Sequence, residues 1–128
     1  MEMEISFPGG ARVDATMGNT VIPTDQSGTA PTPFGLFLAS IGTCAGIYVL
    51  GFCQQRGIST EGIKIVQRLH LNPVNRMVAE VDLDIIVPEE FPERYHEALI
   101  RAADQCAVKK HLENPPTFNV QTKVAAMV

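Results

Sequence analysis

The stretch from Pro33 to Phe52 reads PFGLFLASIGTCAGIYVLGF, and it decides the fold. It lies inside a longer run, from Gln26 to Gln55, that contains no charged side chain. Thr32 before Pro33 is typical of a helix N-terminus, because Thr caps well and Pro fits the first helical position. Gly57 is typical of the residue that follows a helix C-terminus. We therefore predict a helix from Pro33 to near Gly57, apolar on all sides.

Two environments suit an uncharged helix of this length. It is long enough to cross a bilayer. Its glycines and prolines, its small polar Ser40 and Thr43, and the amphipathic strands on both sides favour a buried helix in a protein core instead. The rest of a 128-residue chain is short for covering every face of such a helix. We therefore expect no membrane span and a second copy of the chain, in a homodimer that buries the helix.

Composition limits the class of protein. The 128 residues carry 10 Lys+Arg against 14 Asp+Glu, a net charge of −4, which is typical of one globular domain at residues 1–128. Without a basic run, nucleic-acid binding is disfavoured. The N-terminus Met1–Glu4 is acidic where a signal peptide is basic, so we expect a cytoplasmic protein. The three cysteines lack zinc spacing, and we expect neither a metal nor another cofactor.

Hydrophobic periodicity predicts the other elements. Residues alternate between apolar and polar before the helix and again after it, which indicates β-strands, with Gln67 as one polar exception on an apolar face. Apolar residues at helical spacing follow Pro92 and end at Cys106. We expect strands at residues 3–7, 11–17, 20–23, 63–71, 77–87 and 118–124, and a second helix from Pro92 to Cys106. The fold class is therefore α+β, with antiparallel sheets.

The three cysteines can form few pairs. Cys44 and Cys53 are nine residues apart on one helix, about 13.5 Å along its axis. A disulfide needs Cα atoms within about 7 Å, so Cys106 is the only partner that either one has. Lys109 and the basic residues after it favour a thiolate at Cys106. The alternative is that all three cysteines only pack in the core, as free cysteines commonly do, and this suits Cys53 best.

Two segments carry a resemblance. The segment from Thr32 to Cys44, TPFGLFLASIGTC, and the segment Asp104–Val108, DQCAV, resemble the cysteine motifs of the OsmC/Ohr family, the osmotically inducible and organic hydroperoxide resistance proteins. The order of predicted elements also agrees over nearly the whole chain. The resemblance implies an OsmC-like fold, with a long buried central helix and antiparallel sheets, as an intertwined homodimer. It also implies cysteine peroxidase chemistry without metal or flavin.

Site residues follow from this resemblance. It implies that Cys44 attacks an organic hydroperoxide and that Cys106 resolves the sulfenic acid as a disulfide. A dithiol on a lipoylated or thioredoxin-like protein would then reduce that disulfide. An Arg from the N-terminal strands assists in the family, and Arg12 is the candidate by position. We expect apolar residues of the central helix to line the substrate entrance, namely Phe34, Phe37 and Ile41.

The sequence departs from the family in two places. Phe34 and Gly35 occupy the positions where the family has a Glu that orients the Arg, so that carboxylate is missing. Ala107 follows the second cysteine, where Pro is common. These departures leave a second hypothesis open, a catalytically weak or inactive OsmC-like dimer that binds a small apolar or electrophilic ligand in its interface cleft.

Overall fold

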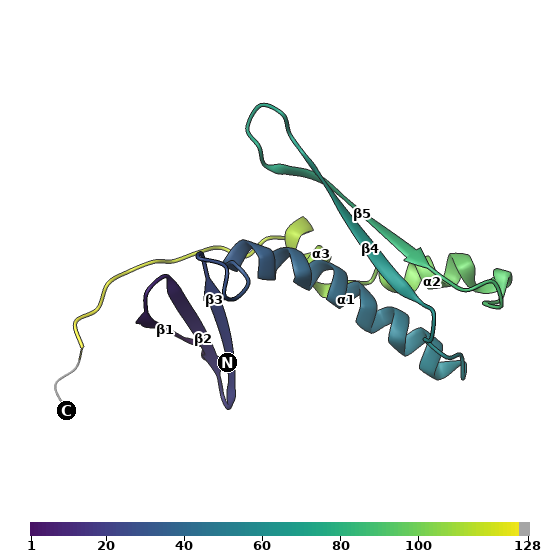
Figure 1. Ribbon diagram of the computed structural model, residues 1–128, viewed down its shortest axis with the longest axis horizontal. Helices are drawn as coiled ribbons and strands as arrows, with labels where there is room; N and C mark the ends of the chain where they lie inside the picture. The colour runs from purple at the N-terminus through teal and green to yellow at the C-terminus, as the bar shows by residue number, and fades with distance from the viewer. Residues whose placement is uncertain (126–128) are drawn as a thin grey trace.

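The computed structural model describes residues 1–125 and confirms the α+β class (Figure 1). A three-stranded antiparallel sheet precedes the long helix α1, an antiparallel hairpin follows it, and short helices end the fold. α1 contacts the hairpin and both later α-helices. The elements are β1 (Glu4–Gly9), β2 (Arg12–Met17), β3 (Thr20–Asp25), α1 (Pro33–Gln55), β4 (Lys64–Leu71), β5 (Val78–Ile86), the 3₁₀ turn η1 (Glu93–Tyr95), α2 (His96–Ala103) and α3 (Ala107–Glu113).

The ends of α1 form as the sequence predicts. The Thr32 side chain accepts a hydrogen bond from the Gly35 N–H at 3.0 Å, and Pro33 occupies the first turn. At the other end Gly57 has a φ of 64°, and the Ile58 N–H donates to the Cys53 carbonyl at 2.9 Å. A positive φ costs glycine little, so Gly57 stops the helix and satisfies its last carbonyls.

One face of α1 is buried within the chain. Val49, Phe52 and Cys53 form the core together with Phe91 and Leu99. Another face stays open: Ile47 and Leu50 are exposed, and Ile47 keeps 66% of its surface. One chain therefore leaves part of the helix uncovered, as the sequence predicts, because its other elements contact only part of the helix.

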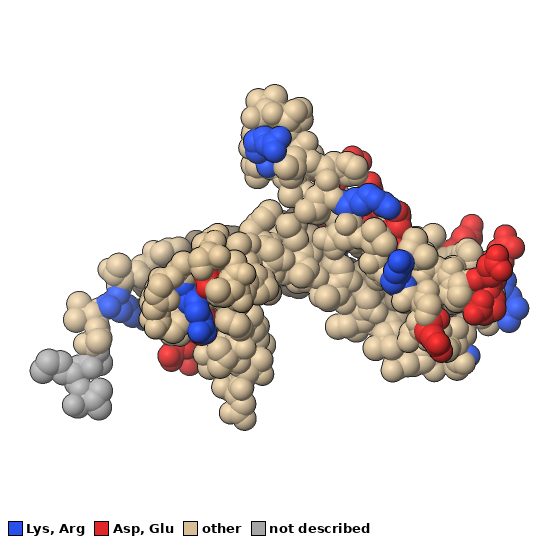
Figure 2. All heavy atoms as spheres, in the orientation of Figure 1, with Lys and Arg blue, Asp and Glu red and all other residues tan. Residues whose placement is uncertain are grey.

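α1 meets the length and composition of a membrane-spanning helix. Core helices of soluble proteins meet the same criteria, so one such helix does not indicate a membrane protein. Figure 2 shows charged side chains on the hairpin and at both ends of the molecule, with uncharged atoms between them. The uncharged middle is the region of α1.

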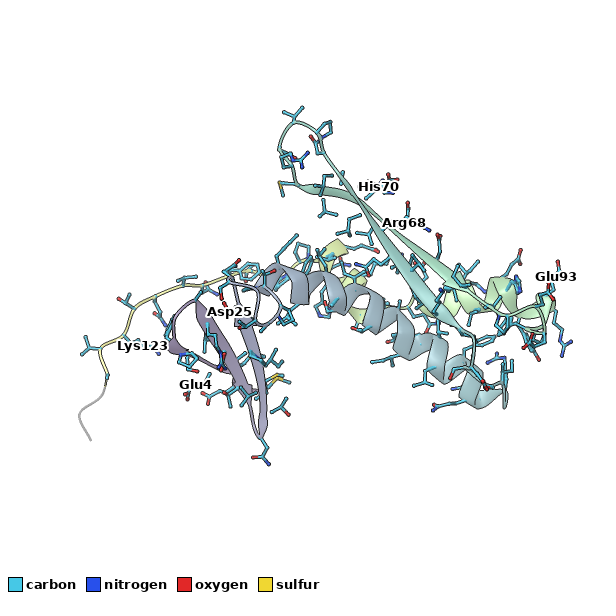
Figure 3. The ribbon with its side chains drawn as sticks, viewed as in Figure 1. Glu4, Asp25, Arg68, His70, Glu93 and Lys123 are labelled. Atoms are coloured by element: carbon cyan, nitrogen blue, oxygen red, sulfur yellow. The ribbon has the colours of Figure 1, made fainter. Side chains whose placement is uncertain are left out.

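The hairpin of β4 and β5 has a charged outer face. Cross-strand ion pairs join Arg68 to Asp84 and His70 to Asp82, the latter at 2.6 Å. All four side chains are half exposed, and Figure 3 shows Arg68 and His70 on the side of the hairpin away from α1. The alternating sequence pattern that predicted these strands therefore corresponds to a solvent-exposed face opposite a packed face.

Gln67, the polar exception, faces α1. Its Nε2 donates to the Leu38 carbonyl at 3.0 Å. A Cβ added at Gly42 would lie only 2.6 Å from the Gln67 Oε1. Gly42 thus provides the space for a polar contact between β4 and the turn of α1 that precedes Cys44.

The predicted helix from Pro92 to Cys106 is wrong in its extent. α2 ends at Ala103, where the Gln105 N–H bonds back to the Ala102 carbonyl and tightens the last turn. Cys106 then caps a separate helix, α3. The apolar stripe still turns Cys106 inward, and only 3% of its surface is exposed. The helical spacing of apolar residues predicted the buried face correctly. It did not predict the break between α2 and α3, because Cys106 still falls at the spacing that a continuous helix would have.

The predicted strand at residues 118–124 is also wrong. Residues 115–125 form no strand, and Phe118, Val120 and Val124 are each more than four-fifths exposed. Figure 1 shows this segment, in yellow, running past the three-stranded sheet towards the C-terminus. Alternation makes a strand only where another strand offers hydrogen bonds, and within the described residues no strand pairs with it.

Candidate functional site

Contact between α1 and α3 brings two of the three cysteines together. Cys44 lies in the middle of α1, and Cys106 lies at the N-cap of α3. The Cys106 Sγ reaches the Ile41 carbonyl, one turn before Cys44 on α1, and each of the two free thiols is close enough to shift the pKa of the other. The structure therefore unites the two residues that the sequence identified as possible partners, across a separation of 62 positions.

Hydrogen bonds from α3 favour the thiolate of Cys44. The backbone N–H of Val108 is the largest cause that holds the pKa of the Cys44 thiol below its ordinary value. The Cys106 thiol and the Ala107 N–H add to this effect, whereas burial opposes it. Donors pointing at a sulfur stabilise its charged form, which is the nucleophilic form.

Cys106 has the opposite tendency. Burial raises the pKa of its thiol, and the neighbouring Cys44 adds to the rise. Its Sγ donates to the Ile41 carbonyl at 3.8 Å and accepts from the Lys109 N–H at 3.5 Å. The expectation that basic residues favour a thiolate here is wrong, because burial raises the pKa of Cys106 more than the Lys109 N–H lowers it. The Lys109 ammonium pairs with Asp104 and Glu113 instead. The pKa values of the two thiols are therefore shifted in opposite directions.

Cys53 takes no part in this pair. It is fully buried in the core, where it packs with Val49 and Phe52. Burial raises the pKa of its thiol. These properties agree with a packing role, since a thiol without access to solvent is unreactive.

Arg12 lies apart from the cysteines in the single chain. Its guanidinium forms an ion pair with Asp14 at 2.7 Å, on the same face of β2. The Asp14 side chain is nine-tenths buried, and in the described structure its Oδ1 has no hydrogen-bond partner. Asp25 lies opposite Arg12 on β3 and is labelled in Figure 3. Sequence reasoning missed Asp14; its i, i+2 spacing on a strand was the available signal.

The predicted entrance residues share one wall. Phe34, Phe37 and Ile41 line an apolar cavity of about 700 Å³ between α1 and the hairpin. A second cavity, of about 380 Å³, shares Ile41 and Leu112 with the first and also borders Cys106. The three side chains are thus together as predicted. The apolar space beside them leads to the Cys106 side of the pair, which the sequence did not indicate.

Side chains that could bind a metal do not gather in residues 1–125. No group of three or more His, Cys, Asp or Glu residues lies close enough to hold an ion there. The histidines have other contacts: His70 pairs with Asp82, His96 lies against Phe91, and the His111 Nδ1 approaches the Ala107 carbonyl. The reactive groups at the site are therefore the two thiols.

Known proteins resemble the chain in family and in fold. A family model described as OsmC-like protein matches residues 25–121. No curated protein sequence matches the chain. The fold is similar to that of a Psychrobacter arcticus protein described as an osmotic stress and detoxification response protein, with a TM-score of 0.69 and 22% identity over 84% of this chain and 85% of that one.

Two further solved structures have the same fold. The OsmC-like protein of Mycoplasma pneumoniae has a TM-score of 0.65 and 12% identity over 89% of this chain and 87% of that one. An organic hydroperoxide resistance protein OsmC of Legionella pneumophila has a TM-score of 0.55 and 18% identity over 88% and 89%. The family match covers most of the sequence, and the fold agrees over most of each chain. The chain therefore belongs to the OsmC-like protein family.

Proposed function

We propose that this protein is a thiol-dependent peroxidase that reduces organic hydroperoxides. One observation carries the proposal: the contact between α1 and α3 brings the free thiols of Cys44 and Cys106 together, with the pKa of Cys44 lowered and that of Cys106 raised. A peroxidase of this type needs one thiolate to attack and one thiol to resolve. Membership of the OsmC-like family and the name of the Legionella relative support the choice of substrate.

The proposed cycle has three steps. The Cys44 thiolate attacks the distal oxygen, the O–O bond breaks, and the alkoxide takes a proton and leaves as an alcohol, with Cys44 oxidised to a sulfenic acid. The Cys106 sulfur then attacks the Cys44 sulfur, so that a disulfide forms and water leaves. A dithiol finally reduces this disulfide and is oxidised to its own disulfide.

Hydrogen bonds and apolar walls give each group a task in this proposal. The Val108 N–H holds Cys44 as a thiolate before the attack. The cavity walled by Phe34, Phe37 and Ile41 takes the apolar part of the hydroperoxide. Arg12, held by Asp14, supplies the positive charge once a second copy of the chain carries it to the cysteine pair.

We also propose a cytoplasmic homodimer with a dithiol reductant. The open apolar face of α1 supports the dimer, since exposed patches of this kind mark interfaces. Family membership supports a lipoylated or thioredoxin-like reductant. Family membership supports the cytoplasm, and the negative net charge disfavours nucleic-acid binding.

A second candidate function is ligand binding without turnover. The apolar cavity of about 700 Å³ is large enough for a small organic molecule, and the first turn of α1 has no acidic residue to orient Arg12. This candidate predicts binding of an apolar or electrophilic compound in the cavity and only slow oxidation of the cysteines.

Mass spectrometry after one equivalent of cumene hydroperoxide separates the two functions. We expect a rapid loss of about 2 Da that maps to a Cys44–Cys106 disulfide, faster than with hydrogen peroxide. Cys44→Ser is expected to abolish peroxide consumption, whereas Cys106→Ser stops after one turnover without added thiol. Cys53→Ala is the matched control and keeps the full reaction. Slow, unselective oxidation of the natural chain would favour the ligand-binding protein.

A further inference from the structure

The large apolar cavity between α1 and the hairpin contains one charged side chain. Among the described residues that line it, Arg76 is the only one with a polar side chain. Within residues 1–125 no carboxylate forms an ion pair with Arg76, whereas Arg68 on the same hairpin is paired with Asp84. Figure 2 shows basic atoms among uncharged ones at the tip of the hairpin.

The backbone of Arg76 is held in a conformation that arginine seldom adopts. Its φ is 62°, a left-handed value that glycine and asparagine adopt at lower cost. Hydrogen bonds fix this turn: the Arg76 N–H donates to the Asn72 carbonyl at 2.8 Å, and the Met77 N–H donates to the Asn75 Oδ1 at 3.0 Å. The turn therefore does not require arginine at this position, and retained strain of this kind points to a function of the side chain.

The cavity lies on the packed side of α1. Phe34 and Ile41 are seven residues apart, and Ile41 continues at helical spacing to the buried Val49. The exposed residues Ile47 and Leu50, which we assign to the dimer interface, fall on another side of the helix. The cavity is therefore separate from the face of α1 that we expect a second copy to cover.

We propose that this cavity binds an apolar chain that ends in a carboxylate, and that Arg76 binds the carboxylate at the mouth. The inference rests on the proposed function for the use of this cavity as the substrate site, and it adds the class of compound. An arginine can lay its apolar stem against apolar side chains and keep its guanidinium in water. The planar guanidinium matches the two oxygens of a carboxylate.

The apolar space connects this mouth to the cysteine pair. The cavity that borders Cys106 shares Ile41, Val81 and Leu112 with the larger one. Arg76 lines only the larger cavity, and Cys106 lines only the smaller one. A chain held at Arg76 by its carboxylate thus extends along apolar walls towards the thiols. A hydroperoxide group carried on such a chain would be directed to the reactive pair.

Charge and apolar burial contribute differently to this binding. The walls stabilise the bound chain in proportion to its buried apolar area, whatever its head group. An ion pair at an exposed residue such as Arg76 adds a smaller, salt-sensitive contribution. Arg76 therefore determines which head group is preferred rather than whether an apolar chain binds.

Calorimetric titration with decanoate and with decanol tests the proposal, because the two probes share an apolar chain and neither oxidises a thiol. In Arg76→Gly the dissociation constant of decanoate should rise about fivefold, whereas that of decanol should change by less than about twofold. Added salt should weaken decanoate binding to the natural chain and have little effect on its binding to Arg76→Gly.

Two controls separate binding from folding and from net charge. Glycine adopts the φ of residue 76 more easily than arginine, so Arg76→Gly should unfold in urea at the same or a higher concentration than the natural chain. Arg68→Gln removes the same charge from the outer face of the hairpin and should bind decanoate as the natural chain does.

The results decide between the proposals. Decanoate binding that is equal in the natural chain and in Arg76→Gly overturns the role of Arg76, and so does an equal loss in Arg68→Gln. Absence of binding of both probes overturns the ligand site, as expected if a second copy fills the cavity. If decanoate binds through Arg76 but cumene hydroperoxide does not oxidise the cysteines, the carboxylate site stands and the peroxidase function fails. If the cysteines are oxidised but decanoate does not bind, the peroxidase stands and this inference fails.

Discussion

Cys44 owes its lowered pKa to a neighbour that is distant in sequence. The Val108 N–H comes from α3, and its hydrogen bond outweighs the opposite effect of burial on the Cys44 pKa. A backbone N–H donor needs no particular side chain, so no sequence motif predicts this hydrogen bond. The chemistry of this residue is therefore set by where α3 begins.

The pH dependence of alkylation tests this arrangement. Because the pKa of Cys44 is lowered, its thiolate persists to lower pH, and its alkylation rate should reach half-maximum below the value of about 8.5 for a free cysteine. Because the pKa of Cys106 is raised, its midpoint should lie above that value. Iodoacetamide rates measured by peptide mapping from pH 5 to 10 provide both midpoints. A Cys44 midpoint at or above 8.5 contradicts the assignment.

Cys53 should affect stability and leave reactivity unchanged. Cys53→Ala removes a fully buried sulfur from the core and should lower the free energy of unfolding by about 1–2 kcal/mol. Urea denaturation measures this loss. The rate of disulfide formation between the other two cysteines should not change by more than about twofold, since Cys53 does not contact them. A large loss of that rate would give Cys53 a role beyond packing.

Sequence reasoning reached some residues of the site and missed others. The impossibility of a Cys44–Cys53 pair follows from helix geometry, so Cys106 was the predicted partner, and the structure brings it to Cys44. The direction of the Cys106 pKa was missed, because it depends on burial and on the neighbouring Cys44 thiol. Roles at a site depend on such contacts, which spacing does not encode.

At the scale of elements, β4 contacts α1 through a polar group. Gln67 interrupts an apolar strand face, and its Nε2 bonds the Leu38 carbonyl over Gly42. The sequence shows the interruption and not its reason. The glycine and the glutamine form one packing unit across two elements.

Two alanine substitutions on α1 test this unit. Gly46→Ala should stabilise the fold by up to about 1 kcal/mol from helix propensity, because its Cβ meets only Ile65 Cδ1 at 3.9 Å. Gly42→Ala has the same propensity gain but pushes Gln67 off its carbonyl, so it should be less stable than Gly46→Ala by about 1–3 kcal/mol. Urea denaturation of both variants measures the difference.

A double-mutant cycle separates the clash from other effects. In a Gln67→Ala background the Gly42→Ala change should become stabilising, since nothing then occupies the space above residue 42. Equal stabilities of Gly42→Ala and Gly46→Ala in the natural background would show that the contact is loose.

Element boundaries were predictable where local chemistry sets them. Thr32, Pro33 and Gly57 bound α1 in sequence and in structure alike. The break between α2 and α3 and the missing strand at residues 118–124 were not predictable. Both depend on partners: a contact with α1 positions Cys106, and a strand needs a neighbouring edge.

At the scale of the whole molecule, the half-covered α1 is the main feature. Its open face carries Ile47 and Leu50 within an uncharged stretch of the chain. We expect the natural chain to sediment as a dimer at micromolar concentration, and Ile47→Asp or Leu50→Asp to shift it towards monomer by placing a charge in the interface. Sedimentation equilibrium measures the shift.

A matched control comes from the hairpin tip. Val74 is 90% exposed and lies far from the open face in the chain, so Val74→Asp should leave the dimer intact. A natural chain that is monomeric and fully folded at the same concentration would contradict the homodimer. It would also leave Arg12 without a route to the cysteine pair.

The cap of α3 has a consequence for measurement. Helix caps are normally Ser, Thr, Asp or Asn, whose oxygens take no part in redox chemistry. Here the capping atom is the Cys106 sulfur, and the proposed reaction consumes it in a covalent bond. The Lys109 amide should therefore exchange its hydrogen for deuterium faster in the oxidised protein than in the reduced one. The exchange rate of one backbone amide in α3 would show whether the protein is in its reduced form, ready for the next turnover.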